Sequence, residues 1–171
     1  MAAALDVAEA ILTRKGDIDS YQLHKLLYFA QAVHLARHHG PLFEDRIEAW
    51  PHGPVVRAVF RVHRRQYRLT TVGGDPSRLA DEDLATIDEL LELYGRHSSE
   101  WLQAQTHIDR PWADARAGLA PDEASHEEIT AAAMLRFYNR VLNDPEVEEA
   151  LAAADTEVGL TSAGIRARYG S

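Results

Sequence analysis

The sequence predicts a mainly α-helical fold: a single compact domain of about six to eight helices with a short two-stranded β-hairpin. Apolar residues recur at spacings of three and four along most of the 171-residue chain. Gly, Pro and Asp residues separate these helical patterns, and no repeat or low-complexity linker divides them. A chain of this length can bury one hydrophobic core. We expect residues 1–155 to form the domain and residues 156–171 to form a loosely ordered tail.

Two helical patterns open the chain. Residues 5–14 predict a short amphipathic helix that stops near Gly16. Asp19 or Ser20 is a suitable N-cap for a second helix, which ends at Gly40. Apolar residues cover most sides of the second helix, which indicates a central position: Leu23, Leu26, Leu27, Tyr28, Ala30 and Val33.

The next segment predicts a strand, a turn and a helix. Residues 45–50, DRIEAW, alternate apolar and polar side chains, and we expect RLTTVGGDP, residues 68–76, to pair with them. Pro54 fits the first turn of a helix, where a missing N–H costs little. The expected helix, residues 55–67, has one apolar face and an opposite face of arginines: Arg57, Arg61, Arg64, Arg65 and Arg68.

Helix-start signals divide the second half of the chain. We expect Asp81 to cap a helix that ends at Gly95, and Ser98 or Ser99 to start the next one. The helical pattern breaks before Pro111 and restarts there.

Two more helices are expected near the C-terminus. Ser125 and Glu128 have the spacing of a capping box, which would open a long helix with Ile129 and Val141 facing inward. We expect residues 145–154 to form a last helix with an acidic first turn, where the helix dipole favours carboxylates.

The composition excludes several kinds of site. The chain has no cysteine, so disulfides, thiolate catalysis and Cys-ligated zinc are excluded. Asp6 and Glu9 come too early for a signal peptide, and no apolar run approaches the roughly 18 residues that a membrane span needs. We therefore expect a cytoplasmic protein that does not contact a membrane.

The charge is distributed unevenly. Residues 1–80 carry 11 basic and 8 acidic groups, whereas residues 81–171 carry 7 basic and 19 acidic groups. This balance opposes non-specific nucleic-acid binding and favours a basic partner. The arginine face could follow a nucleic-acid backbone or meet a partner's carboxylates. We prefer pairing with the acidic second half, within the chain or between subunits of a homo-oligomer, over nucleic acid.

Histidines are numerous and need a separate interpretation. His34 and His38 stand one helical turn apart, a spacing that can share a metal ion, with His39 adjacent. Zincin sites place a glutamate after the first histidine, and Leu35 stands there. We therefore favour surface or boundary histidines near a helix C-terminus, and we expect no metal or cofactor.

His52 and His107 lie in irregular segments, where functional groups are common. As general bases they would need an orienting carboxylate, such as Asp45 or Asp109, and a nucleophile. No complete catalytic motif accompanies them. We favour a protein that is not an enzyme, with a His-dependent hydrolase or a nucleic-acid-binding protein as alternatives.

Three segments resemble the Panacea domain family, which includes SocA-like antitoxins and phage-associated GepA-like proteins. They are LHKLLYFAQAVHLARHHGPLFEDRIEAWPHGPVVRAVFRVHRRQY at 23–67, YGRHSSEWLQAQTHIDRPWADAR at 94–116 and ITAAAMLRFYNR at 129–140. The family pattern is L-x-K-L-L-Y-x-A-Q, then a tryptophan and G-P-V-V, then T-H-x-x-x-P-W. The pieces occur here in that order, and the resemblance extends from about residue 5 to 142.

The resemblance implies a bacterial antitoxin that neutralises a toxin, usually encoded beside it, by direct protein contact. Members of the family pair with toxins of many unrelated kinds, in contexts that include phage defence. Some are similar to adaptors that deliver the toxin to a cytoplasmic protease. Some relatives carry an extra DNA-binding module, for which this chain has no room, so we do not expect it to regulate an operon alone.

The motif positions have mostly apolar or conformational residue types, so we interpret them as scaffold. They are Leu23, Lys25, Leu26, Leu27, Tyr28, Gln31, Trp50, Gly53, Pro54, Val55, Val56, His107, Pro111 and Trp112. Two residues depart from the pattern: His24 stands where glutamine is common, and His52 where an aromatic residue often precedes Gly-Pro.

Exposed aromatic and arginine side chains are the expected anchors for a partner, because such residues dominate binding energy once buried. The partner-binding candidates are Arg57, Arg61, Arg64, Arg65, Tyr28, Trp50 and His52.

Overall fold

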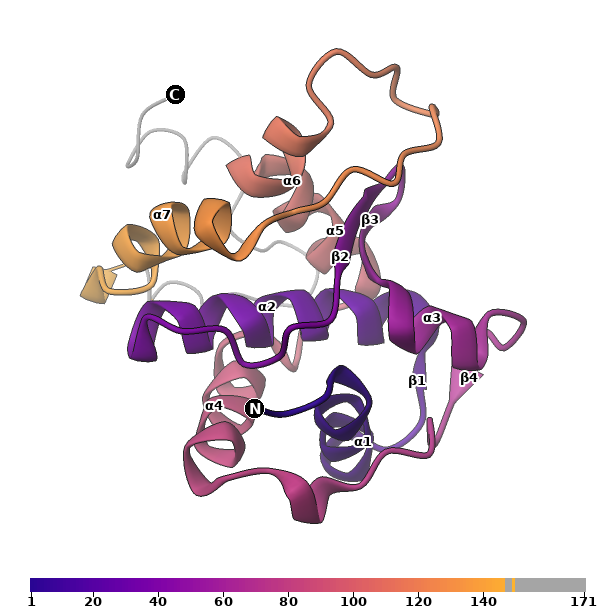
Figure 1. Cartoon of the computed structure of the whole chain (residues 1–171), viewed down its shortest axis with the longest axis vertical. Helices are drawn as coiled ribbons and strands as arrows, with labels where there is room; N and C mark the ends of the chain where they lie inside the picture. Colours follow the sequence, from indigo (N-terminus) through magenta and orange to yellow (C-terminus); the bar gives the residue numbers. More distant parts are fainter. Residues whose placement is uncertain (147–148, 150–171) are drawn as a thin grey trace.

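The computed structural model describes residues 1–146 and 149, which form a single, mainly α-helical domain, as predicted (Figure 1). The described elements are α1 (Ala4–Lys15), β1 (Ile18–Asp19), α2 (Ser20–His38), β2 (Ile47–Trp50), β3 (Gly53–Val56), α3 (Arg57–His63), β4 (Arg68–Leu69), the 3-10 helix η1 (Pro76–Arg78), α4 (Asp81–Tyr94), α5 (Ser99–Ile108), α6 (Arg110–Ala115) and α7 (Ala131–Val141). The expected tail and most of the expected helix at 145–154 lie outside the described residues.

Helix α2 is the centre of the fold, and α1, α4, α5 and α7 pack around it (Figure 1). Every residue from Leu23 to Ala36 is buried, which confirms the central position that the sequence predicts. The Asp19 side chain accepts a hydrogen bond from the Gln22 amide at 2.7 Å and so caps the helix. His39 ends it in the left-handed conformation.

The predicted hairpin exists, but its predicted partner strand was wrong. Strand β2 pairs with β3, with Trp50 opposite Gly53, because a two-residue turn joins the two segments directly. Residues 68–69 pair instead with β1. Pro54 was expected to start a helix but lies in β3 opposite Ala49. Its backbone nitrogen faces away from β2, so the strand tolerates the missing N–H.

The start of α7 also differs from the prediction. The Ala49 amide donates to Glu127 O at 2.9 Å, and the Ile129 amide donates to Ile47 O at 2.9 Å. This pairing keeps residues 127–129 extended along β2, so the predicted capping box at Ser125 does not form. Helix α7 begins only after Thr130, whose side chain accepts from the Ala133 amide at 3.1 Å.

The remaining helices follow the predicted pattern closely. Helix α4 starts at Asp81 with Ala80, rather than Asp81, as N-cap, and the Asp83 carboxylate accepts from the Ala80 amide at 2.9 Å. Ser98 caps α5, as one of the two predicted alternatives. Helix α6 includes Pro111 in its first turn. Among the described residues, no helix has the length and hydropathy of a membrane span.

The predicted arginine face is not continuous, because α3 ends at His63. Arg64 and Arg65 follow it in a turn. Arg57 and Arg68 do form ion pairs within the chain, but with acidic residues of the first half rather than the second: Arg57 with Glu48 at 3.5 Å and Arg68 with Asp17 at 3.0 Å.

A buried polar group lies among the aromatic side chains of the core. Phe29 stacks on Tyr94 with ring centroids 4.0 Å apart. The Tyr138 hydroxyl contacts the Asp109 carboxyl and lies 3.1 Å from the Tyr28 hydroxyl. Burial raises the pKa of Asp109 to about 7, although hydrogen bonds from Tyr138 and from a neighbouring glutamine oppose the shift.

Candidate partner-binding groove

A groove of about 390 Å³ forms where the start of α2, the β2–β3 turn and the segment after α3 meet. Its lining combines aromatic, histidine and basic side chains. The main lining residues are Tyr21, His24, Lys25, Trp50, His52, Phe60, His63, Arg64, Arg65 and Tyr67.

Two exposed tyrosines form the rim of the groove. Tyr21 is 46 % exposed and Tyr67 is 61 % exposed, and their ring centroids lie 6.3 Å apart. The centroid of the His52 ring also lies 6.3 Å from that of the Tyr21 ring. Large aromatic side chains grouped at a surface are typical of sites that become buried in a complex. The sequence interpretation missed both tyrosines.

Lys25 forms part of the floor. The residue is 2 % exposed, and its ammonium lies 5.1 Å from the centre of the Tyr21 ring. Within the described chain, no hydrogen-bond or ion-pair partner contacts this ammonium. Burial lowers the pKa of Lys25 to about 8, while Asp19 acts in the opposite direction. The floor therefore offers a poorly hydrated cation with free N–H donors to an incoming anion.

A histidine pair lies beneath the groove. His24 Nδ1 accepts from the Val56 amide at 3.1 Å, so the ring proton lies on Nε2. That atom donates to His63 Nε2 at 2.7 Å. Burial lowers the pKa of both histidines, and the neutral pair fixes α2 against β3 and α3. His24, a departure from the family pattern, is thus a structural link.

Trp50 forms the opposite wall and is held from two sides. Its indole nitrogen donates to the Glu48 carboxylate at 2.7 Å, and its ring packs on Phe60 with centroids 4.7 Å apart. Burial alone would raise the pKa of Glu48. Hydrogen bonds from His126 and Trp50 and the charge of Arg57 outweigh burial and lower it. The charged carboxylate therefore anchors a fixed aromatic wall.

A known protein family matches the part of the chain that contains most residues of the groove. The antitoxin SocA-like, Panacea domain family matches residues 23–113, just over half of the chain. This chain belongs to the SocA-like Panacea domain family. No curated protein and no solved structure matches it.

The third Panacea motif, T-H-x-x-x-P-W, packs against the tryptophan that lines the groove. The His107 ring stacks on Trp112 with centroids 3.9 Å apart, and the Trp112 indole donates to Trp50 O at 2.9 Å. Burial, followed by the charge of Lys25, lowers the pKa of His107 to about 4. In the described chain, neither His107 nor His52 hydrogen-bonds to a carboxylate or a hydroxyl. The geometry therefore gives no support to the hydrolase alternative.

Other Panacea motif residues build the scaffold. Leu23, Leu26, Leu27, Val56 and Pro111 are buried. Pro54 is buried and Val55 half-buried, and both line the groove.

The Gln31 side chain fixes the loop after α2. Its amide nitrogen donates to Phe43 O at 2.9 Å, and its oxygen accepts from the Leu42 amide at 2.8 Å. This glutamine therefore satisfies loop backbone groups that would otherwise be buried without partners.

The partner-binding candidates separate into three groups. Four of them line the groove: Trp50, His52, Arg64 and Arg65. Arg57 and Arg61 lie on α3 but do not line it, and Arg57 is paired with Glu48. Tyr28 was a wrong choice as an exposed anchor, because it is fully buried in the aromatic core.

Proposed function

We propose that the chain is the antitoxin of a bacterial toxin-antitoxin pair and that it neutralises its toxin by direct binding in the groove. Membership of the SocA-like Panacea family supports the antitoxin role. The observation that carries the location is the Lys25 ammonium, which has no hydrogen-bond or ion-pair partner among the described residues and lies beneath the exposed Tyr21 ring in a groove that exposed Tyr67 also lines.

The lining of the groove favours a toxin segment that combines an aromatic or aliphatic side chain with a carboxylate. The apolar side chain would fill the space between Trp50, Tyr21 and Tyr67, and the carboxylate would meet Lys25. Arg64 and Arg65 add positive charge along the same groove. Such charge complementarity speeds association and selects the partner, while the aromatic contacts supply most of the affinity.

Co-expression with the product of the adjacent gene tests the proposal. We expect the wild-type chain to restore growth and to form a complex that a pull-down recovers. The Tyr21→Ala/Tyr67→Ala double variant should weaken the complex at least tenfold, about 1.4 kcal/mol. Val62→Ala is the matched control, because Val62 is 51 % exposed but does not line the groove. Equal affinity in the double variant and the wild type would contradict the location.

A second pair of variants tests the charge of the groove. Arg64→Ser/Arg65→Ser should slow association and reduce neutralisation, whereas Arg61→Ser should leave both unchanged, because Arg61 is exposed outside the groove. Association rates at low and high salt measure the effect. An adaptor function would appear differently: the toxin would disappear from cells only where a cytoplasmic protease is present.

A further inference from the structure

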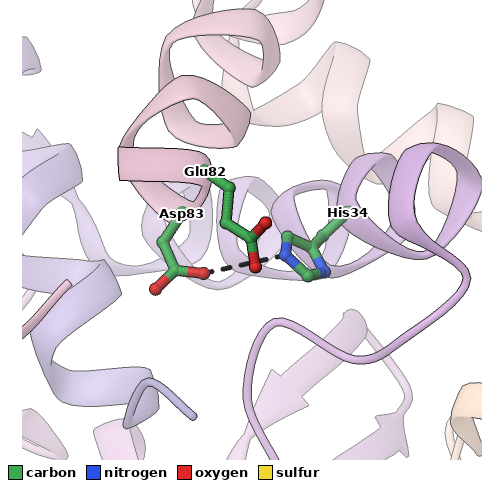
Figure 2. A group of neighbouring side chains, drawn as sticks. All are labelled: His34, Glu82 and Asp83. Atoms are coloured by element: carbon green, nitrogen blue, oxygen red, sulfur yellow. Dashed lines mark ion pairs between the residues drawn. The ribbon is translucent and has the colours of Figure 1, made fainter. Parts of the chain in front are cut away.

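Three potential metal ligands meet at the far end of α2, away from the groove. His34 on α2 faces Glu82 and Asp83 in the first turn of α4 (Figure 2). One ligand atom from each residue lies within 4.8 Å of the other two. Since α2 rises about 1.5 Å per residue, His34 and Tyr21 are separated by about 20 Å along the helix.

The hydrogen bonding of His34 leaves one ring nitrogen as a free electron-pair donor. His34 Nδ1 lies 2.8 Å from the Gly40 carbonyl, which can only accept, so Nδ1 carries the proton. In the neutral ring, Nε2 then has an unshared pair. This atom is buried without a hydrogen-bond partner in the described chain, and the side chain is 7 % exposed. Metal-bound histidines show the same arrangement, with the second nitrogen donating to a carbonyl.

The Asp83 carboxylate is oriented toward this nitrogen. Its Oδ2 accepts from the Ala80 amide at 2.9 Å, which holds Oδ1 at 3.7 Å from His34 Nε2. The distance exceeds that of a hydrogen bond. Two electron-pair donors that face each other at this distance can share a cation as common ligands. The neighbouring Glu82 carboxylate adds a second negative charge and favours a doubly charged ion.

We propose that His34 Nε2, Asp83 and Glu82 bind a first-row divalent cation such as Zn²⁺, with water completing its coordination. Zinc lies about 2.0–2.2 Å from such ligands, which places neighbouring ligands in a tetrahedral site about 3.4 Å apart. The His34–Asp83 separation of 3.7 Å is close to this spacing. Glu82 is exposed, so its side chain can close the remaining gap. An imidazole ligand favours zinc, cobalt or nickel over magnesium.

The bound ion would join α4 to the end of α2. We expect the ion to stabilise the fold. The two helices bring their ligands together only in the folded chain, so the ion binds the folded state in preference to the unfolded one. The site lies outside the groove, so the metal and toxin proposals can succeed or fail independently.

Titration of the untagged, EDTA-treated full-length chain with Co²⁺ or Zn²⁺ tests the proposal. We expect one ion per chain by calorimetry, with Co²⁺ giving visible absorption bands, and a higher melting temperature with Zn²⁺. Glu82→Gln should reduce the affinity at least tenfold without affecting the fold, because Glu82 is exposed. His34→Gln should remove the stoichiometric site.

Two neighbouring variants serve as controls. Asp81→Asn changes the same helical turn, and His38→Gln changes the exposed ring whose centroid lies 4.5 Å from that of His34. Both should retain the affinity within twofold. The proposal is overturned if the wild type binds no Co²⁺ or Zn²⁺, if His38→Gln removes binding, or if Glu82→Gln binds as well as Asp81→Asn.

Discussion

Lys25 is one of two lysines in the chain, and its burial places its pKa, about 8, close to neutrality. The ammonium is charged below this pKa and becomes neutral as the pH rises through it. A carboxylate bound in the groove would favour the charged form. Affinity for an acidic partner should therefore be complete near pH 7 and should fall above pH 8.

We expect the affinity of the wild type for its toxin to fall about tenfold between pH 7 and 9, and that of Lys25→Met to change little. Calorimetric titration with the co-purified toxin at both pH values measures the effect. Lys15→Met is the control, because the Lys15 ammonium donates to Gly95 O at 2.5 Å outside the groove. A parallel loss of affinity in Lys25→Met would assign the pH dependence to other groups.

From the sequence, Lys25 could be identified as a motif residue, but the place of its side chain in the groove could not be predicted. Lys25 occupies a family motif position within a buried helix, so it looked like scaffold. No pattern of spacing shows that its side chain ends under a tyrosine from the same helix and beside a turn 28 residues later. The four partner-binding candidates that line the groove were chosen for their irregular or charged positions, whereas Tyr28 is buried because its helix is packed on nearly all sides.

The hairpin is the element that shapes the groove, and Gly53 is its most constrained residue. Its φ is +119°, and an added Cβ would lie 3.2 Å from Lys25 Cε and 3.4 Å from Thr106 Oγ1. Gly53→Ala therefore combines backbone strain with two close contacts. We expect it to destabilise the fold by about 1–3 kcal/mol, measured by urea unfolding.

Gly118→Ala separates the two causes. Gly118 also has a positive φ, +86°, but an added Cβ would meet nothing within 4 Å. Its replacement should cost only the backbone strain, about 1 kcal/mol. If both variants lose the same stability, the contacts with Lys25 and Thr106 are unimportant.

Helix positions were predictable because their signals are local. Caps such as Asp19 and Ser98 hydrogen-bond to amides three residues away, and the apolar spacing repeats within each helix. The errors lie where distant segments decide the conformation. Residues 127–129 are extended because β2 supplies their hydrogen-bond partners, and Pro54 joins a strand because the chain turns back at Pro51.

At the scale of the whole molecule, buried titratable groups make stability depend on pH in opposite directions. The pKa values of His24, His63 and His107 are lowered mainly by burial. The stability that these neutral histidines contribute to the folded state is therefore fully present above about pH 6.5 and is lost as the pH falls. The pKa of Asp109 is raised to about 7. Its contribution is complete below about pH 4 and is lost as the pH rises through 7.

Asp109→Asn should remove the opposing contribution. Between pH 4 and 7, the free energy of unfolding should rise more steeply with pH in the variant than in the wild type, by a few kcal/mol in order of magnitude. Urea unfolding across this range measures both slopes. Parallel curves would show that Asp109 titrates alike in the folded and unfolded chains.

The groove is a property of the whole molecule. Its walls come from the start of α2, the hairpin turn and the segment after α3, and only the fold brings these segments together. The spacing of residues in the sequence describes one element at a time. It therefore suggested some residues that line the groove, but it could not predict that the groove exists.

The two edges of the β2–β3 hairpin have a consequence for how a partner can bind. Residues 127–129 cover the outer edge of β2, while on β3 the Val56 amide donates to His24 and Pro54 has no amide proton. A free strand edge would allow another chain to extend the sheet through generic backbone hydrogen bonds. This hairpin is closed to strand addition, which also removes a template for edge-to-edge aggregation. A toxin that docks here must be distinguished by its side chains.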